Sequence, residues 1–502
     1  MYTFSKGLKN TALVLMILGL VGIVYGFLST PKTIEEVEKI VAASHHGNHD
    51  TKADAHNTHE VVANHHEAKE EVKTEAEAEV SKTDTTSVVD HKDTTKTEVA
   101  PLVKEDQDHH DNHAASNVSE SKVDAEKEHK EHLEHVLHQL QNKPWSALYV
   151  ACIFFMLISL GVLAFYAIQQ VAQAGWSPVL FRVMQGITAY LPVGSLIFFG
   201  LLVLSALHLN HLFVWMEDGV TEVGHANYDK LIAGKSGYLN VTFWLVRAAV
   251  FLIGWNLYRY MSRKNCLAQD ESNDNTFYKK NFKLSAGFLV FFIVTESIMS
   301  WDWLMSFDPH WFSTLFGWYV FASFFVSGIT TISMVTLYLK SKGYLENVNS
   351  SHIHDLSKFM FGISVFWTYL WFSQFMLIWY ANIPEEVTYF ITRINDYNLP
   401  FFGAVVMNFV FPLLVLINTD FKRIAPIIVG AGIVILLGHY IDFFNMVMPA
   451  TVGDQWFIGV SEIASVLFFL GLFIFVVFTA LSKAPLTPKR NPFIEESKHF
   501  HY

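Results

Sequence analysis

Ionisable side chains inside long apolar runs are the residues of this 502-residue sequence with the clearest chemical potential. The set comprises His208, His211, Arg247, Glu296, Asp302, His439, Asp442 and Glu462. Charged side chains within a bilayer are costly and usually line proton paths or make polar contacts between helices. Histidines and carboxylates can accept the protons that oxidation of a quinol releases, because histidine titrates near neutral pH. We therefore expect these residues to form a proton path, with quinol contacts at His208 and Asp302.

The spacing of four of these residues predicts two pairs on helical faces. His208 and His211 are three residues apart, and so are His439 and Asp442. Residues three apart share one face of a helix, so each pair could act on a single proton or ligand. Two alternatives stay open for the histidines and acids. They could form interhelical hydrogen bonds that only fix the bundle, or histidines could ligate a single b-type haem.

Arg247 is the only cation of the set. It would cost about 2.5 to 3.5 kcal/mol if it faced lipid near the middle of the membrane. We therefore expect it to face the bundle and a carboxylate, either Glu296 or Asp302.

Ten apolar runs of about 20 residues would position these side chains. They cover residues 8–28, 145–169, 190–215, 238–260, 282–303, 314–339, 356–381, 399–418, 424–444 and 458–482. At 1.5 Å per residue, a helix of this length crosses the roughly 30 Å hydrocarbon core. The runs lack the alternation of barrel strands, and a lipid-exposed backbone must satisfy its own hydrogen bonds. The sequence predicts an all-α polytopic membrane protein, with a large soluble helical protein as the alternative.

Residues 29–143 have a different composition from the rest of the chain. They contain no aromatic residue, 15 histidines, 26 acids and 13 lysines, which gives a formal charge of −13 in a chain of −12. Such a segment cannot bury a core, so we expect a largely disordered, solvated insert. Its His-His pairs could instead bind transition metals weakly. Only residues 123–141 have the charge pairs of a short exposed helix, such as Glu126 with Lys130.

The distribution of basic residues predicts the orientation of the chain. With the N-terminus in the cytoplasm, the short loops and tails place 18 Lys and Arg on the cytoplasmic side and only Lys230, Lys235 and Arg393 outside. The positive-inside rule then puts both termini in the cytoplasm of a bacterial inner membrane and the His-rich insert in the periplasm. The first run resembles a signal peptide, but its length favours a retained helix. The simplest interpretation of seven tryptophans is an aromatic belt at the outer interface: Trp215, Trp301, Trp303, Trp311, Trp318, Trp379 and Trp456.

Related ends of two runs indicate an internal duplication. Asp302 precedes Pro309 by seven residues, and Asp442 precedes Pro449 by seven. Such repeats are common in polytopic proteins. The expected organisation is a transmembrane helix (1–28), the insert (29–143), two parallel four-helix bundles (144–305 and 306–450), and a tenth helix with a cytoplasmic tail (451–502).

Three long segments resemble a known family. They are SWDWLMSFDPHWFSTLFG (300–317), HDLSKFMFGISVFWTYLWFSQFMLIWYANIPEE (354–386) and GHYIDFFNMVMP (438–449). They look like the NrfD/PsrC-type membrane subunits of alternative complex III, a bacterial quinol:cytochrome c oxidoreductase. The similarity covers essentially all of residues 145–482, and the His-rich insert after a first helix is most like the ActF type.

The resemblance implies a subunit without a redox centre in a hetero-oligomeric complex. Implied partners are a second NrfD-like subunit, an iron-sulfur subunit, and multihaem and monohaem cytochrome c subunits, besides membrane lipid and without nucleic acid. Haem c and iron-sulfur clusters would then sit on the partners, which agrees with only two cysteines, Cys152 and Cys266, in this chain. It also implies a proton route through His208, His211, Asp302, His439 and Asp442. A secondary transporter with an outward-facing polar site and a purely structural scaffold are the alternatives.

Overall fold

The computed structural model describes residues 2–47 and 113–501, and every regular element in these residues is helical. Ten helical segments are long and apolar enough to span a membrane: Lys6–Leu28, His132–Val171, Pro178–Ala206, Val241–Gln269, Thr276–Phe307, Phe316–Ser341, Ser350–Ala381, Asn398–Leu416, Ala425–Thr451 and Val460–Leu481. The prediction of an all-α polytopic membrane protein is confirmed.

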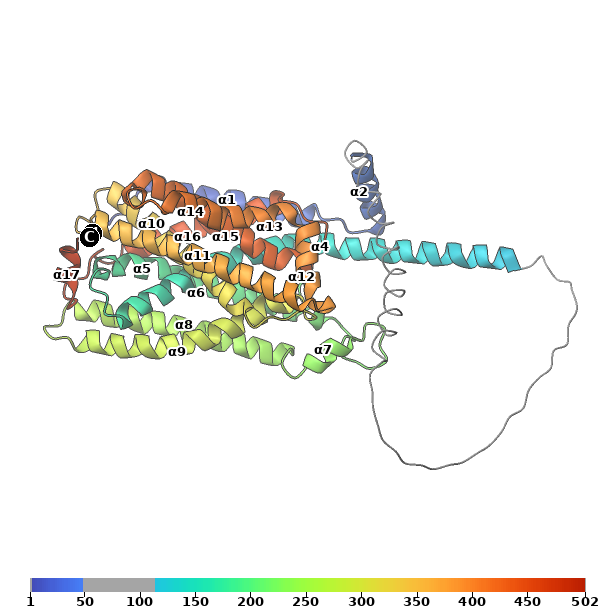
Figure 1. Ribbon diagram of the computed structural model, residues 1–502, viewed down its shortest axis with the longest axis horizontal. Helices are drawn as coiled ribbons and strands as arrows, with labels where there is room; N and C mark the ends of the chain where they lie inside the picture. The colour runs from blue at the N-terminus through green and yellow to red at the C-terminus, as the bar shows by residue number, and fades with distance from the viewer. Residues whose placement is uncertain (1, 48–112, 502) are drawn as a thin grey trace, which may run out of the picture. The chain divides into compact units, whose positions relative to one another are not determined.

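Most of the spans are single helices, arranged side by side in Figure 1. These are α1 (Lys6–Leu28), α4 (His113–Val171), α8 (Val241–Gln269), α9 (Thr276–Trp303), α10 (Phe316–Ser341), α11 (Ser350–Ala381), α15 (Ala425–Thr451) and α16 (Val460–Leu481). Two spans are interrupted by local turns. The third consists of η1 (Pro178–Leu180), α5 (Phe181–Ile187), η2 (Thr188–Tyr190) and α6 (Leu191–Ala206), and the eighth of α13 (Asn398–Val405), a π-turn η5 (Val406–Val410) and α14 (Phe411–Leu416).

Short helices lie between the spans or after them. They are η3 (Val214–Met216), α7 (Lys230–Lys235), η4 (Met305–Phe307), α12 (Pro384–Asn395), η6 (Phe421–Arg423) and α17 (Ile494–Lys498). Two of these short helices, η4 and α12, contact α15 and contribute residues to a cavity near the candidate site.

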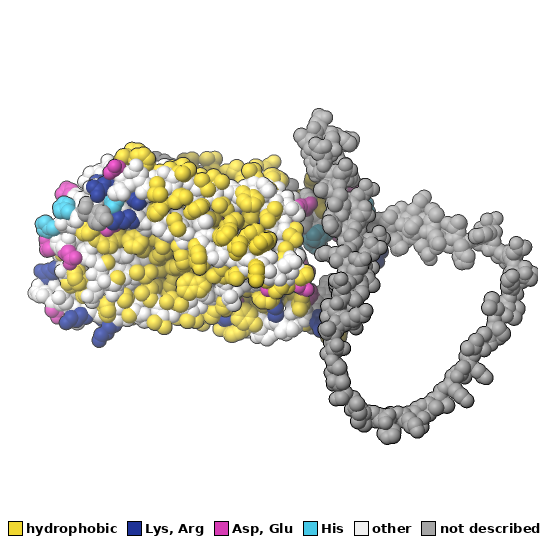
Figure 2. All heavy atoms as spheres, in the orientation of Figure 1, with side chains coloured by type: hydrophobic (Ala, Val, Ile, Leu, Met, Phe, Trp, Pro, Cys, Tyr) yellow, Lys and Arg dark blue, Asp and Glu magenta, His cyan; other side chains and the backbone are white. Residues whose placement is uncertain are grey.

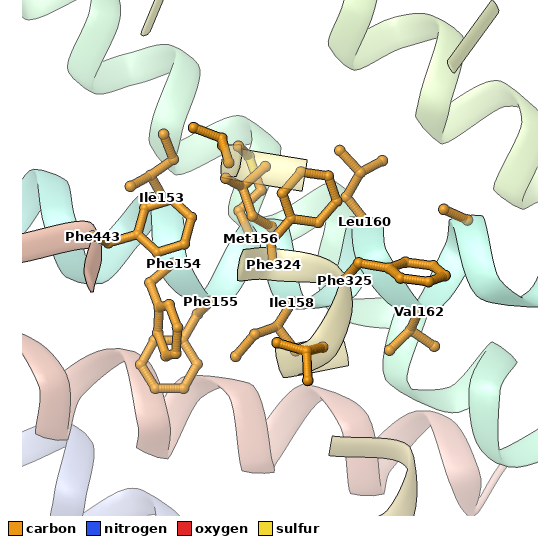
Figure 3. Close-up of a cluster of buried hydrophobic side chains, with 14 of the residues drawn as sticks. Ile153, Phe154, Phe155, Met156, Ile158, Leu160, Val162, Phe324, Phe325 and Phe443 are labelled. Carbon is orange, nitrogen blue, oxygen red and sulfur yellow. The ribbon is translucent and has the colours of Figure 1, made fainter. Parts of the chain in front are cut away.

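The membrane segments of α4 and α10 form the centre of the bundle, where both are almost entirely buried. The two helices approach closely through glycines. A Cβ atom on Gly161 would lie 2.6 Å from the carbonyl oxygen of Phe324, and one on Gly328 would lie 2.9 Å from the nitrogen of Val162. Small residues allow such contact between membrane helices. Figure 3 shows Phe154, Phe155, Phe324 and Phe325 packed in this central region.

A second glycine contact holds α1 against α16. Gly19, Gly22 and Gly26 face α16 at the positions of Phe468, Ala464 and Ser461. On α16, a Cβ atom at Gly471 would lie 2.6 Å from the carbonyl oxygen of Ala12. This small-residue spacing explains why the first span packs on the last, although they are far apart in the sequence.

The two chain ends lie at the same end of the helical bundle. Near the N-terminus, the Tyr2 ring contacts the rings of Tyr344 and Phe478. Near the C-terminus, the carbonyl oxygen of Phe500 accepts a hydrogen bond from Asn349 at 2.6 Å. Figure 2 shows a broad apolar belt, with most of the visible Lys and Arg side chains at this end. The assignment of this end to the cytoplasm stays a prediction.

The duplication stays a prediction, and a short sequence pattern shared by α4 and α10 agrees with it. The central helix α4 contains YVACIFF at residues 149–155, and α10 contains YVFASFF at residues 319–325. Each is the first helix of its predicted four-helix set. The tyrosines also play related parts, because Tyr149 donates a hydrogen bond to the carbonyl oxygen of Trp303 on α9, and Tyr319 donates one to Asp442 on α15.

Several predicted helix ends are wrong, and two of them affect the candidate site residues. The third span ends at Ala206, not at residue 215, because His208 takes a left-handed conformation (φ 56°). The amide of Leu209 then bonds to the carbonyl oxygen of Leu204, a common way to end a helix, and histidine tolerates this conformation better than most residues. The ninth span continues past residue 444 to Thr451. Asp442 therefore lies inside α15 and does not close it.

The acidic insert contains more helix than its composition predicted. The first described part forms α2 (Ile34–Gly47), which begins with Glu35 and Glu36. The predicted short helix at 123–141 is part of α4, which continues without a break into the second span. A pair between Lys130 and Glu134 at 3.8 Å lies on it. The predicted pair of Glu126 with Lys130 involves the Glu126 side chain, which lies outside the described ones. Residues 48–112 of the predicted insert also lie outside the described residues.

Candidate functional site

Asp302 and Arg247 form a buried ion pair between α9 and α8. The guanidinium donates from Nε to one carboxylate oxygen at 2.7 Å and from its NH2 nitrogen to the other at 2.9 Å. Asp302 is fully buried. Such two-point contacts fix both side chains. Of the two predicted partners of Arg247, Asp302 is therefore the correct one, and Glu296 is not.

The Arg247 guanidinium also contacts a backbone carbonyl and two aromatic rings. Its NH1 nitrogen donates to the carbonyl oxygen of Tyr238 at 3.1 Å. The rings of Tyr238 and Phe243 lie 4.0 and 4.3 Å from its central carbon. Burial raises the pKa of the Tyr238 hydroxyl, and the Asp302 carboxylate raises it further. Each of the three nitrogens of the guanidinium thus donates at least one hydrogen bond.

Asp442 on α15 is equally buried but meets different groups. One carboxylate oxygen accepts a hydrogen bond from the Tyr319 hydroxyl. The other accepts from Ser323 Oγ at 2.7 Å and from Trp367 Nε1 at 2.9 Å. Among the described residues, its only ion-pair partner is His439, at 3.8 Å. This carboxylate therefore has neutral donors where Asp302 has a guanidinium.

His439 extends the polar chain along α15. Its Nδ1 lies 2.9 Å from Ser323 Oγ, so serine connects the imidazole to the carboxylate of Asp442. Its Nε2 is buried and, among the described residues, has no hydrogen-bond partner. Asn408, in the π-turn of the eighth span, is another buried side chain whose amide atoms have no described partner. It packs against Gly438, next to His439 in the sequence.

A cavity of about 90 Å³ lies beside this second acid site. It is lined by Leu304, Met305, Phe307, Asp308, Trp311, Phe316, Thr388, Tyr389, Thr392, Arg393, Met446, Pro449 and Ala450. These residues come from the end of α9 and the loop that follows, from α12, and from the end of α15. This volume exceeds the roughly 10 to 15 Å³ that one water molecule requires, so the cavity is large enough to admit water.

Two side chains of α12 give this cavity its electrostatic character. Arg393 is buried, and its Nε has no hydrogen-bond partner among the described residues. Burial raises the pKa of the Tyr389 hydroxyl, and the Arg393 cation lowers it. The carboxylates of Asp442 and Asp308 also raise this pKa, so both act on the same hydroxyl. The Tyr389 hydroxyl is thus within electrostatic reach of both the buried Asp442 and the half-buried Asp308.

The other predicted site residues do not join these two acids. His208 and His211 are exposed in the loop after α6, which contradicts their prediction as a pair on one face of the third helix. Glu296 is buried on α9, where one carboxylate oxygen contacts Ser297 at 3.1 Å and the other has no described partner. Glu462 caps the start of α16 by accepting from the Gly459 amide at 2.8 Å. Their roles in a proton path stay predictions.

Three of the seven predicted interfacial tryptophans are core residues. Trp215, Trp303 and Trp311 are 4%, 0% and 3% exposed, so they cannot form a belt at the lipid surface. Trp318 and Trp379 are exposed, as an interfacial belt requires.

Sequence reasoning missed a polar network at the opposite end of the bundle. The Tyr166 hydroxyl has polar atoms of Gln170, Gln185, Ser262 and Asn281 within 3.0 to 3.3 Å. Beside it, Arg182 pairs with Asp270 at 2.6 Å. Most of these groups are neutral amides and hydroxyls, which a search for titratable residues passes over. In the described part of the chain, three or more His, Cys, Asp or Glu side chains nowhere assemble as a metal site.

Comparison with known proteins does not assign the chain to a family. No family model matches the chain, and no curated protein matches it significantly. The chain is a multi-pass membrane protein by its ten candidate spans, and its lipid-facing helices fit contact with membrane lipid.

Proposed function

We propose that this chain is an integral membrane subunit of a quinol-oxidising respiratory complex and that it contributes a proton-transfer path through Asp442. The complex would be of the alternative complex III type. Iron-sulfur and haem c subunits would carry the electrons, and a second NrfD-like subunit would be its neighbour in the membrane.

One observation supports the proton path above the others. Asp442 is a buried carboxylate whose donors are two hydroxyls and an indole, without the guanidinium that holds Asp302. Tyrosine, serine and histidine can pass protons to a carboxylate within hydrogen-bond reach. Tyr389 and Asp308 line one cavity, and the carboxylates of Asp442 and Asp308 both act electrostatically on the Tyr389 hydroxyl. We therefore assign proton transfer to the second acid site.

The resemblance supports the choice of complex. Two of its three segments enclose the acids in question, since 300–317 contains Asp302 and 438–449 contains Asp442. The third, 354–386, contains Trp367, which donates to Asp442. The three segments thus contain Asp302, Trp367 and Asp442, whereas Arg247, Tyr319 and Ser323 lie outside them. Contact of a quinol with His208 and Asp302 stays a prediction.

Purification tests the membership in such a complex. The full-length chain, tagged and extracted in mild detergent from its native membrane, should retain c-type haem with an absorption spectrum of tightly bound cytochrome subunits. A secondary transporter would be isolated without haem, and that result would contradict the proposal.

Proteoliposomes test the proton path. The complex with Asp442→Asn should keep its haem and lose proton release coupled to quinol oxidation by about tenfold or more, because the amide cannot accept a proton. The control is Asn408→Asp, which adds a carboxyl near the same helix and leaves Asp442 in place. Unchanged proton release in Asp442→Asn would leave only a structural scaffold.

A further inference from the structure

Two arginines, Arg259 and Arg263, lie near the end of α8 that is remote from Asp302. The last residue of α8, Gln269, donates a hydrogen bond to the carbonyl oxygen of Arg490 at 3.2 Å, so this end of α8 meets the C-terminal segment. The two arginines are four residues apart, and they therefore lie on one face of the helix. Both side chains are half-buried.

Neither arginine pairs with a carboxylate of the described residues. The ion pairs of arginine in this part of the chain are those at Asp270 and Asp302, and neither pair includes Arg259 or Arg263. The Nε of Arg259 is buried and has no hydrogen-bond partner among the described residues. A cation that is partly buried in a membrane protein is costly unless an anion or a carbonyl group meets it.

The charges around the two arginines have the same sign as their own. Arg263 acts electrostatically on Arg259, and Arg182 acts on Arg263. Arg263 and Arg182 line one crevice together with apolar residues from the range 480–486 at the end of α16. Lys483, in the same range, is exposed. This end of α8 thus has an excess of positive charge.

The acid at the end of α8 does not offset this excess. One oxygen of Asp270 accepts a hydrogen bond from Arg182 at 2.6 Å, and the other accepts from the amide of Lys489 at 2.8 Å. No described carboxylate acts electrostatically on Arg259 or Arg263. The counter-ion of the two arginines should therefore come from outside the described residues.

The depth of the arginines in the membrane favours a lipid as the source of that anion. The 29 residues of α8 extend about 43 Å, which exceeds the roughly 30 Å hydrocarbon core by about 13 Å. With this excess divided between both ends, Arg263 lies close to the boundary of the core and Arg259 one turn deeper. A carboxylate of a soluble partner would have to enter the bilayer to reach Arg259, whereas a long arginine side chain can extend to the lipid phosphates at the boundary.

The neighbouring surface of α8 can accommodate acyl chains. Ile253, Leu257 and Tyr260 are exposed and follow one another at helical spacing, so they form an apolar stripe that ends beside the arginines. Lys264, at the end of this stripe, is also exposed. Arginine is suited to phosphate because its guanidinium can donate two parallel hydrogen bonds.

We propose that Arg259 and Arg263 bind the phosphate of an anionic phospholipid, whose acyl chains lie along the stripe of α8. A zwitterionic lipid carries a cation next to its phosphate and would leave the charge of the arginines uncompensated. The site is separate from Asp302 and Asp442, and it does not depend on the proposed complex.

Native mass spectrometry tests the site. The full-length chain, with any subunits that stay attached, is delipidated in detergent and titrated with phosphatidylglycerol or with phosphatidylcholine of the same acyl chains. One cation near a membrane surface strengthens the binding of an anionic lipid about fivefold, so two should give about a thirtyfold preference for the first phosphatidylglycerol.

Paired substitutions show whether these two arginines cause the preference. Arg259→Met with Arg263→Met should bind both lipids equally, and it should fold because it leaves no described acid without its partner. Arg259→Gln with Arg263→Gln should behave in the same way and gives a second test if the methionine variant aggregates. Lys279→Met with Lys280→Met is the matched control, because it removes two charges from exposed positions at the neighbouring start of α9. This control should keep the wild-type preference.

Each outcome decides for or against the lipid site. Loss of the preference in the arginine variants alone supports it, whether or not the chain purifies with haem. An unchanged preference in these variants overturns it, and so does an equal loss in the lysine control, which would indicate attraction by net charge. Displacement of phosphatidylglycerol by millimolar inorganic phosphate would overturn the lipid in favour of a free anion. Loss of a protein subunit from the arginine variants, with the lipid preference unchanged, would overturn it in favour of a protein partner.

Discussion

Asp302 on α9 and Asp442 on α15 hold matching places in the predicted duplication, but their surroundings differ. Arg247 occupies both oxygens of Asp302. Asp442 receives its hydrogen bonds from Tyr319, Ser323 and Trp367. A carboxylate held by a fixed cation has little reason to change its protonation, whereas one held by neutral donors can do so without leaving a buried charge unpaired. We therefore expect the ion pair at Asp302 to play a structural part, and the proposed proton transfer belongs to Asp442.

The two sites also differ in what adjoins them. Asp302 is one residue from the end of α9, and the Arg247 guanidinium is enclosed by aromatic rings. Asp442 lies nine residues before the end of α15, in the same part of the bundle as the cavity at Tyr389 and Arg393. Both acids are buried, so the difference between them lies in the groups that hold each carboxylate.

Neutralisation of each acid should separate these roles most clearly. Asp302→Asn leaves the buried Arg247 cation without its partner and should lower the free energy of unfolding by about 3 to 5 kcal/mol. Asp442→Asn leaves no cation unpaired and should cost about 1 kcal/mol. Denaturant unfolding of the detergent-solubilised protein, followed by tryptophan fluorescence, measures both.

A double substitution controls that comparison. Arg247→Met with Asp302→Leu removes both charges, and it should recover most of the stability that Asp302→Asn loses, because buried ion pairs can be replaced by apolar groups. Equal losses in the two single variants would show that Asp302 and Asp442 play the same part.

The corresponding tyrosines test the same comparison with a smaller change. Tyr149→Phe and Tyr319→Phe each remove one buried hydrogen bond, so each should cost about 1 kcal/mol of stability. Only Tyr319→Phe should also slow proton release in proteoliposomes, by about tenfold, because its hydroxyl contacts the carboxylate and that of Tyr149 contacts a backbone carbonyl. Equal proton release in the two variants would remove Tyr319 from the path.

The membrane explains how much of this fold could be predicted from sequence. The thickness of the bilayer sets the length of apolar runs, so all ten spans were found. The end of the third span was missed because Leu207, Leu209 and Leu212 continue the apolar run after the helix has stopped. A left-handed turn at His208 changes the backbone without changing the hydropathy.

The two acid sites were predictable to different degrees. A cation in an apolar run needs a carboxylate, and this argument led from Arg247 to two candidates, Glu296 and Asp302, between which the structure decided. Tyr319, Ser323 and Trp367 gave no such signal, because uncharged residues are common in membrane helices. The motifs YVACIFF and YVFASFF would have aligned Tyr149 with Tyr319 and drawn attention to the latter. The neutral network at Tyr166 was missed for the same reason.

The smallest expected effect is a change in the stability of two short helices, α7 in the first predicted set of four helices and α12 in the second. Near the first, Asp229 caps α7 through the amides of Leu231 and Ile232, and it lies 2.6 Å from His310. The backbone hydrogen bond from Ile232 and the hydrogen bond with His310 hold the pKa of Asp229 below its usual value. Near the second, Tyr389 of α12 stacks on Trp311, a contact that does not titrate with acid.

Acidification should therefore loosen α7 before α12. A lowered pKa in the folded state means that the cap stabilises α7 above the ordinary aspartate pKa of about 3.9, and that this stabilisation is lost as pH falls through the folded value. Hydrogen exchange between pH 6 and pH 2, corrected for intrinsic rates, should show protection falling at Leu231 and Ile232 but not at the amides around Tyr389. Asp229→Asn keeps a good cap that cannot titrate, so its protection at α7 should not change with pH. Parallel loss at α7 and α12 in the wild type would instead indicate acid unfolding of the whole outer end, and the contrast between the two sets would not extend to their loops.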